Sequence, residues 1–163
     1  MAATTLAGRV AVQEGAFDAA EETRALTAGR EDVGAVASFL GVCRGGGGLV
    51  AMTLEHYPGV TEAAIAAHRA EAARRWPALT GCTVVHRVGR LAPGEPIVLV
   101  LTASAHRAAA LEACAFLMDW LKTRAPFWKC EHLADGREAW VEARESDDAA
   151  AARWDRPTAA AAA

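Results

Sequence analysis

Alternating apolar and polar positions predict two strands in the first third of the chain. Residues 9–15 (RVAVQEG) alternate over a short stretch, and residues 49–57 (LVAMTLEHY) alternate over a longer one. The two faces of the second strand are expected to carry Val50, Met52, Leu54 and His56 on one side and Thr53, Glu55 and Tyr57 on the other. The glycine run 45–48 before this strand is typical of a flexible break.

Three other segments are apolar enough to be buried strands. Residues 33–44 (VGAVASFLGVCR) favour a buried strand, although an Ala-rich helix fits the same letters. Residues 82–91 (CTVVHRVGRL) and 96–104 (PIVLVLTAS) predict two strands joined by the Ala-Pro-Gly-Glu turn at 92–95. The second of these is almost wholly apolar, so we expect it in the centre of the sheet.

Helical spacing of apolar residues predicts helices over residues 16–29, 62–76 and 105–125. Thr61 and Ser104 are the expected N-caps of the second and third helices, because a hydroxyl oxygen can accept from the free N–H groups of a first turn. The core-facing stripes are predicted to be Ile65, Ala72 and Trp76 in the second helix, and Leu111, Cys114, Met118 and Leu121 in the third.

The C-terminal part begins with a hairpin pattern. Residues 127–133 (FWKCEHL) and 138–144 (EAWVEAR) flank an Asp-Gly turn, and residues 147–163 begin as a helix. These elements predict one α+β domain over residues 1–154, with a mostly antiparallel or mixed sheet and a C-terminal β-hairpin. The Ala-rich residues 155–163 are expected to be a disordered tail.

Charge and length exclude several classes of function. A formal net charge of -3 and a pI near 5.9 argue against a nucleic-acid partner, because such proteins carry an excess of cations over a whole face. No apolar run reaches the roughly 18 to 20 residues needed to cross a bilayer, and the N-terminus lacks the pattern of a secretory signal. We therefore expect a cytoplasmic protein without a membrane partner.

The four cysteines, Cys43, Cys82, Cys114 and Cys130, contain no C-x-x-C pair. This spacing argues against a zinc ribbon and against a disulfide scaffold, so no metal site is expected and the thiols are interpreted as reduced and mostly buried. Cys43 and Cys130 adjoin Arg44 and Lys129, which leaves open that these two thiols are reactive thiolates.

Three local cationic clusters stand out in this acidic chain. Arg44 borders the glycine run, where backbone can approach a ligand closely. His106 and Arg107 follow Ser104 at the start of the third helix, where free N–H groups favour anions. Each cluster has a plain alternative: a solvated arginine at a loop tip for Arg44, and a capping turn with solvated side chains for His106 and Arg107.

The third cluster is residues 121–131 (LKTRAPFWKCE), where Lys122 and Lys129 flank an apolar core. Pro126 ends the helix between them, so the chain can turn and bring both ammonium groups to one pocket walled by Phe127 and Trp128. Two ammonium groups held against apolar walls could serve as acid, base or nucleophile. The alternative is one lysine that stabilises a helix C-terminus and a second on a strand surface.

Other histidines are weaker candidates. Glu55 and His56 are adjacent in a strand and so point to opposite faces, which favours a structural His56. His86 and Arg87 are interpreted as packing or interface residues.

Several motifs in one order carry a resemblance to a known family. They are TLEHYPGVTEAAI, RWP, VVHRVGRLAPGEPIVLV, SAHRAAALEA, MDWLKTRAPFWKCE and WVEARESD. The region from Val33 to Trp154 that contains them resembles the large, catalytic subunit of molybdopterin synthase, the MoaE family.

The resemblance implies an α/β hammerhead fold and a homodimer of large subunits within a heterotetramer. The partner it implies is a small ubiquitin-like sulfur-carrier subunit, whose C-terminal Gly-Gly thiocarboxylate enters a pocket of the large subunit. Sulfur then passes to cyclic pyranopterin monophosphate and forms the dithiolene of molybdopterin. No metal or organic cofactor is implied.

By the same resemblance, Lys122 and Lys129 are the expected catalytic residues. The expected substrate-binding residues are Val42, Cys43, Arg44, His106, Arg107, Lys122, Lys129, Cys130 and Glu131, with Cys130 and Glu131 extending the wall of the lysine site. The alternative function is a non-catalytic module that binds an anion or a carrier protein.

The chain departs from the family at two places. Only four glycines stand where many members have a longer polar loop after the arginine that matches Arg44, so contacts from that loop are in doubt. Val42 stands where the family often has Lys or Thr, so only its backbone is carried over. Cys43 and Cys130 are not expected to donate sulfur, because sulfur arrives on the carrier.

Overall fold

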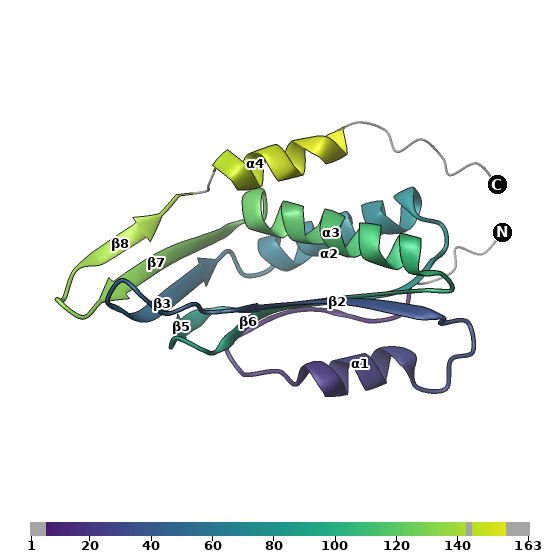
Figure 1. The fold of residues 1–163 in the computed structure, drawn as a ribbon, viewed down its shortest axis with the longest axis horizontal. Helices are drawn as coiled ribbons and strands as arrows, with labels where there is room; N and C mark the ends of the chain where they lie inside the picture. Colours follow the sequence, from purple (N-terminus) through teal and green to yellow (C-terminus); the bar gives the residue numbers. More distant parts are fainter. Residues whose placement is uncertain (1–5, 143–144, 156–163) are drawn as a thin grey trace.

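Two four-stranded sheets form the framework of the protein (Figure 1). The structure is a computed structural model and describes residues 6–142 and 145–155. The strands in this part of the chain are β1 (Val10–Gln13), β2 (Ala35–Val42), β3 (Leu49–His56), β4 (Leu79–Arg87), β5 (Gly89–Leu91), β6 (Pro96–Ser104), β7 (Phe127–Leu133) and β8 (Glu138–Val141). The helices are α1 (Ala19–Thr27), α2 (Val60–Arg75), α3 (Arg107–Thr123), α4 (Glu145–Ala152) and the 3₁₀ turn η1 (Arg153–Asp155).

The first sheet has the strand order β1-β4-β6-β2. β4 and β2 are antiparallel to β6, and β1 is parallel to β4. Figure 1 shows α2 and α3 on one face of this sheet and α1 on the other. The core between these two helices and the sheet contains Ile65 of α2, Leu117 of α3, Val84 and Val100, each 1% exposed or less. This sheet is buried on both faces, which explains why the apolar segment 96–104 lies at its centre.

The second sheet has the order β5-β3-β7-β8, and every pairing in it is antiparallel. It forms the end of the molecule at the left of Figure 1. Cys43, Met52, Leu54 and Leu91 make a small buried cluster on its inner face. The predicted C-terminal hairpin and the single α+β domain are therefore confirmed, but the strands form one mixed and one antiparallel sheet where a single sheet was expected. No helix in the described residues is long and apolar enough to cross a membrane.

The two predicted N-caps are wrong. Gly59, with a φ of 82°, is the N-cap of α2, and its N–H donates to the Glu62 carboxylate at 2.7 Å. Thr61 lies inside the first turn and ties two loops instead: its hydroxyl accepts from the Tyr57 N–H and donates to the Pro126 carbonyl. Ser104 ends β6 and donates to the Ala78 carbonyl at 2.9 Å, because strand pairing keeps it out of the helix.

Burial differs from the sequence prediction at three places. The segment 33–44 does form a strand, but β2 is an edge strand, so only its residue Ala37 is buried. Leu111 is 60% exposed, although Cys114, Met118 and Leu121 of the same predicted stripe are buried. Val50 is 47% exposed at the start of β3. The periodicity of apolar residues predicted each helix and strand, but it does not determine how much of each element is covered by the elements packed against it.

The 3₁₀ turn η1, which follows α4, is bonded to α3 through one carboxylate. Asp119 Oδ2 accepts from the Trp154 indole N–H at 2.7 Å and from Arg153 Nη2 at 2.7 Å. The predicted helical start of residues 147–163 is confirmed by α4. Of the predicted disordered tail, residues 156–163 lie outside the described residues, whereas Asp155 ends η1 and accepts from the Arg124 guanidinium at 3.1 Å.

Candidate functional site

Lys122 and Lys129 lie on either side of the turn that joins α3 to β7. Lys122 is in the last turn of α3 and is exposed, and Lys129 is the third residue of β7 and is half-buried. They are the only two lysines among the 17 basic residues of the chain, all the others being arginine. The scarcity of lysine is a signal that the sequence alone carries.

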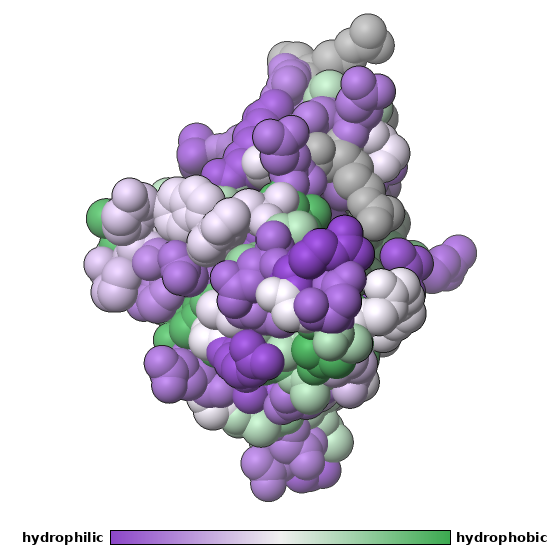
Figure 2. All heavy atoms as spheres, turned by 90° about the vertical axis from the view of Figure 1, so that its left-hand side faces the viewer, coloured by the Kyte–Doolittle hydropathy of each residue, from purple (hydrophilic) through white to green (hydrophobic). Residues whose placement is uncertain are grey.

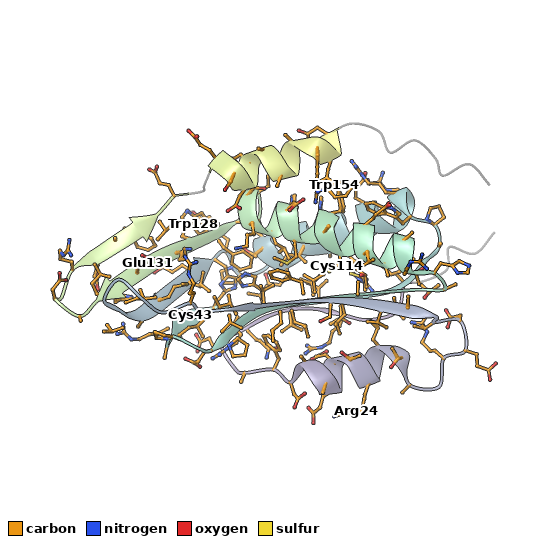
Figure 3. The ribbon with its side chains drawn as sticks, in the orientation of Figure 1. Arg24, Cys43, Cys114, Trp128, Glu131 and Trp154 are labelled. Carbon is orange, nitrogen blue, oxygen red and sulfur yellow. The ribbon has the colours of Figure 1, made fainter. Side chains whose placement is uncertain are left out.

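Strand alternation puts Lys129 and Glu131 on the inner face of the second sheet. Lys129 pairs with Leu54 and Glu131 pairs with Met52, and both of these partners belong to the buried cluster that contains Cys43. Figure 3 shows Glu131 and Cys43 at this end of the molecule, well away from Cys114. The structure therefore brings a cation, a carboxylate and a thiol of the predicted set together.

The pKa of the Cys43 thiol is shifted by burial and by the charged groups around it. Burial raises its pKa above the ordinary value, the nearby Glu95 and Glu131 carboxylates add to that rise, and the Lys129 ammonium opposes it. Cys43 is 1% exposed and carries no disulfide. A thiol with a raised pKa is protonated at neutral pH, so the reactive-thiolate interpretation is disfavoured for Cys43.

The backbone around Cys43 is fixed on both sides. Its N–H donates to the Glu95 carbonyl at 2.8 Å, and its carbonyl accepts from the Gly94 N–H at 2.7 Å. These bonds hold the exposed neighbours Val42 and Arg44 at the end of β2, next to the Lys129 face. Of the glycines that follow, those at positions 46–48 have open space around them and a positive φ, a conformation that suits glycine.

Two predicted wall residues face the other way. Trp128 pairs with Glu55 and Cys130 pairs with Thr53, so both side chains lie on the outer face of the second sheet. The predictions that Trp128 walls the lysine pocket and that the Cys130 side chain extends the same wall as Glu131 are therefore wrong, because neighbouring residues in a strand alternate. Only the backbone of Cys130 can contribute to the Lys129 face.

Phe127 does lie on the Lys129 face. Its ring stacks on the imidazole of His86 with centroids 3.8 Å apart. Burial lowers the pKa of His86 to about 4, so this imidazole is neutral at pH 7. Of the two predicted roles of His86 and Arg87, packing or interface, the structure supports packing: each is 7% exposed, and Arg87 donates to Glu95 and to the Glu14 carbonyl.

His106 and Arg107 lie at the opposite end of α3 from Lys122. The helix has 17 residues, and the 15 steps from Arg107 to Lys122 correspond to about 22 Å at 1.5 Å per residue. His106 is the N-cap of α3 but makes no side-chain capping bond, and both residues are exposed. Within one chain, the structure therefore does not bring this cationic pair to the lysines.

The outer face of the second sheet carries a second group of polar and aromatic residues. A shallow hollow at the His56 end of β3 is lined by Glu55, Tyr57, Trp128 and Trp140 of this face, and by His56 from the neighbouring position. The rings of Tyr57 and Trp128 meet edge to face at 4.8 Å. Figure 2 looks onto this end of the molecule and shows polar residues over most of the surface, with apolar residues in small separate patches. His56 Nε2 lies 3.7 Å from Glu62, in keeping with its structural interpretation.

All four cysteines are buried, as predicted, and each is free of a disulfide in the structure. Burial raises the pKa of Cys82 to about 12 and that of Cys114 to about 11. These two thiols pack inside the first sheet's core and take no part in the site.

The chain is similar to proteins of one family. The family model described as MoaE protein matches residues 12–124. A molybdopterin synthase catalytic subunit of Mesorhizobium japonicum is 60% identical over 151 residues, covering 91% of this chain and 94% of that protein. The solved MoaE protein of Burkholderia ambifaria is 49% identical with a TM-score of 0.78, covering 91% of this chain and 99% of that one.

A more distant structure shares the fold. It is the complex of subunits 1 and 2 of the molybdopterin-converting factor from Helicobacter pylori, with a TM-score of 0.71, 20% identity, and coverage of 83% of this chain and 91% of that one.

Proposed function

We propose that this chain, which belongs to the MoaE family, works as the catalytic subunit of a molybdopterin synthase and transfers sulfur from a carrier protein to a pterin. The sulfur source is the C-terminal thiocarboxylate of a small ubiquitin-like subunit. The acceptor is cyclic pyranopterin monophosphate, which gains the two sulfurs of the molybdopterin dithiolene. Family membership carries the assignment as a molybdopterin synthase subunit, and the sites described above support the sulfur-transfer step.

The observation that carries this step is the placement of the chain's two lysines. A chain that uses arginine at its 15 other basic positions keeps lysine only at 122 and 129. Arginine stays charged at any ordinary pH, whereas a lysine amine can give up its proton and act as a base or nucleophile. Both substrates are anions, a thiocarboxylate and a cyclic phosphate, and ammonium groups stabilise negative charge where it develops.

We assign the roles as follows. Lys122 handles the thiocarboxylate and the sulfur transfer, and Lys129 binds the pterin and moves protons beside Glu131. Arg44 and the backbone at Val42 and Cys43 line the mouth of the same site, where the guanidinium suits a phosphate. Sulfur arrives on the carrier, so neither cysteine is a donor, and the step needs no metal or organic cofactor.

The partner in this proposal is the small carrier subunit; the Helicobacter pylori structure, one chain of which shares this fold, is itself a complex of two subunits. A heterotetramer with two large subunits in its centre completes the assembly. We also propose a cytoplasmic location, which agrees with four free cysteines in the structure.

The homodimer is supported by the exposed edge of β2. Val36, Phe39, Leu40 and Val42 are each at least 36% exposed on this strand. Among the described residues, β6 is the only strand that pairs with β2, so its other edge has free N–H and C=O groups. A long apolar edge strand of this kind is normally covered, and a second copy covers it with two-fold symmetry.

Antiparallel pairing of two β2 strands also explains the distance between the cationic clusters. The Ala35 end of β2 pairs with Ser104, two residues before His106, and the Val42 end leads to Arg44. In a two-fold pair, the Ala35 end of one copy meets the Val42 end of the other. His106 and Arg107 of one copy then lie near Arg44 of the other, and the anion site is completed between chains.

The test is a reconstituted assay with the thiocarboxylated carrier and the pterin precursor. Lys122→Ala and Lys129→Ala are each expected to lower the rate by about 10²- to 10³-fold, the usual cost of losing a group that stabilises developing charge. Lys122→Arg keeps the positive charge but has no amine that can lose its proton. If Lys122 takes part in the transfer itself, the rate of this variant is expected to stay as low as that of Lys122→Ala.

The matched control is Arg124→Ala. This cation lies between the two lysines in sequence but pairs with Asp155, away from the proposed chemistry, so the variant is expected to keep its rate. If the chain were a non-catalytic binding module, replacing either lysine should leave the rate of the reconstituted reaction unchanged. That result, in variants that still form the dimer, would remove the catalytic assignment.

A further inference from the structure

The outer face of the second sheet holds three metal-ligand side chains that the sulfur-transfer chemistry does not use. Cys130, His132 and Glu138 each offer one ligand atom, and these atoms lie within 4.8 Å of one another. Cys130 and His132 are two residues apart on β7, so both point outward, and Glu138 on β8 pairs directly with His132. These residues form no metal motif in the sequence, because the group forms only when β7 pairs with β8.

The histidine in this group is already held in place on both sides. Its Nδ1 lies 3.0 Å from Glu138 Oε1, and its Nε2 lies 2.7 Å from the Thr53 hydroxyl. A metal ion at Nδ1 would replace the proton between His132 and Glu138, while Nε2–H donates to Thr53. A ring nitrogen held by an outer hydrogen bond of this kind is the usual state of a metal-binding histidine.

The three side chains also differ in access. Cys130 is 4% exposed, the His132 side chain is 17% exposed, and the Glu138 side chain is 67% exposed. An ion can therefore enter past Glu138 and reach a sheltered thiol. Arg90 pairs with Thr53 on the same face of the sheet, and its positive charge repels a cation. The cation must therefore be held by bonds to its ligands rather than by a negative potential over the whole face.

We propose that Cys130, His132 and Glu138 form a site for Zn²⁺ or a similar borderline-soft divalent cation. Thiolate, imidazole and carboxylate are the three ligand types that zinc takes in proteins, and Mg²⁺ or Ca²⁺ would prefer oxygen ligands alone. Binding deprotonates the thiol and releases its proton. Three protein ligands leave a fourth tetrahedral position for water, and the ion links β7 to β8.

The test uses the metal-free full chain titrated with Co²⁺ and then Zn²⁺. One Co²⁺ per chain is expected to give the intense visible bands of a tetrahedral site and a near-ultraviolet band from thiolate to cobalt, which Zn²⁺ removes by displacement. Cys130→Ala, His132→Ala and Glu138→Gln should each weaken binding by at least tenfold, and Thr53→Val by about 10- to 100-fold through loss of the outer hydrogen bond.

Two matched variants separate this face from the opposite one. Glu131→Gln changes a neighbouring carboxylate that points inward, and Cys43→Ser changes the thiol on the inner face, so both should bind Co²⁺ like the parent. Circular dichroism of each variant checks that it folds. The proposal is overturned if Co²⁺ gives only octahedral bands, if Cys130→Ala keeps the thiolate band, or if Cys43→Ser loses it.

Discussion

A mixture of two inactive variants is expected to recover activity if the anion site is completed between chains. Arg107→Ala removes the cation at the start of α3, and Lys129→Ala removes the ammonium on β7. The distance of about 22 Å along α3 separates Arg107 from the Lys122 end of the same chain. Each pure variant is therefore defective in both of its sites, whichever chain supplies the missing group.

The recovery can be worked out from the symmetry. Random exchange of subunits in an equal mixture makes about half of the dimers mixed, and one of the two sites in each mixed dimer combines an intact Lys129 with an intact Arg107 from the other chain. The mixture should then show about a quarter of the parent's rate. The assay is the reconstituted sulfur transfer after dissociation and reassociation of the mixed chains.

Sites contained in one chain give a different result. Every site in every dimer would then lack one of the two groups, and mixing would leave the rate at that of the pure variants. A failure to rise above that level, with subunit exchange shown by mass spectrometry, would refute the antiparallel β2 pairing. Lys122→Ala mixed with Lys129→Ala is the matched control, because both residues belong to one α3–β7 unit and no mixed dimer has an intact site.

Two stability predictions follow from burial. Leu117→Ala is expected to lower the free energy of unfolding in urea by about 2 to 5 kcal/mol, because Leu117 is 1% exposed, whereas Leu111→Ala in the same helix should change it by under about 0.5 kcal/mol. Equal losses would contradict the assigned faces of α3. His86 has a pKa of about 4 when folded against an ordinary 6.5, so the unfolded chain takes up the proton first on acidification and stability falls from pH 6.5 towards pH 4. The loss in the free energy of unfolding reaches about 3 kcal/mol. His86→Phe keeps an aromatic ring stacked on Phe127 and should remove this part of the pH dependence, measured by urea unfolding at several pH values. If the free energy of unfolding of the variant falls with pH as steeply as that of the parent, a neutral buried His86 is contradicted.

The helices and strands were largely predictable because their signals are local. The apolar run 96–104 had the length, the valines and isoleucine, and the preceding turn that favour a buried strand, and the Asp-Gly turn marked the β7–β8 hairpin directly. The two N-caps were wrong for a tertiary reason. Thr61 and Ser104 were taken up by hydrogen bonds to Pro126 and Ala78, residues that are distant in sequence from their hydroxyls.

The candidate site was predictable in its residues but not in its arrangement. Lys122, Lys129 and Arg44 were visible as cations in an acidic chain and through their place in family motifs. The alternation of side chains along a strand was enough to predict that Cys130 and Lys129 lie on opposite faces of β7. The burial of Cys43 beside Lys129 was not predictable in this way, because it depends on β2 ending next to β7. That contact joins residues far apart in the chain.

The sequence by itself determined the elements, the single domain and the identity of the two lysines, because periodicity, turn chemistry and composition are properties of neighbouring residues. Only the tertiary structure decided that β2 is an exposed edge, that α3 keeps His106 and Arg107 away from Lys122, and that Cys130, His132 and Glu138 meet across the hairpin. The physical reason is that these features depend on how strands pair and sheets pack between residues far apart in sequence. Such pairing and packing decide which layer covers a strand and which side chains come into contact.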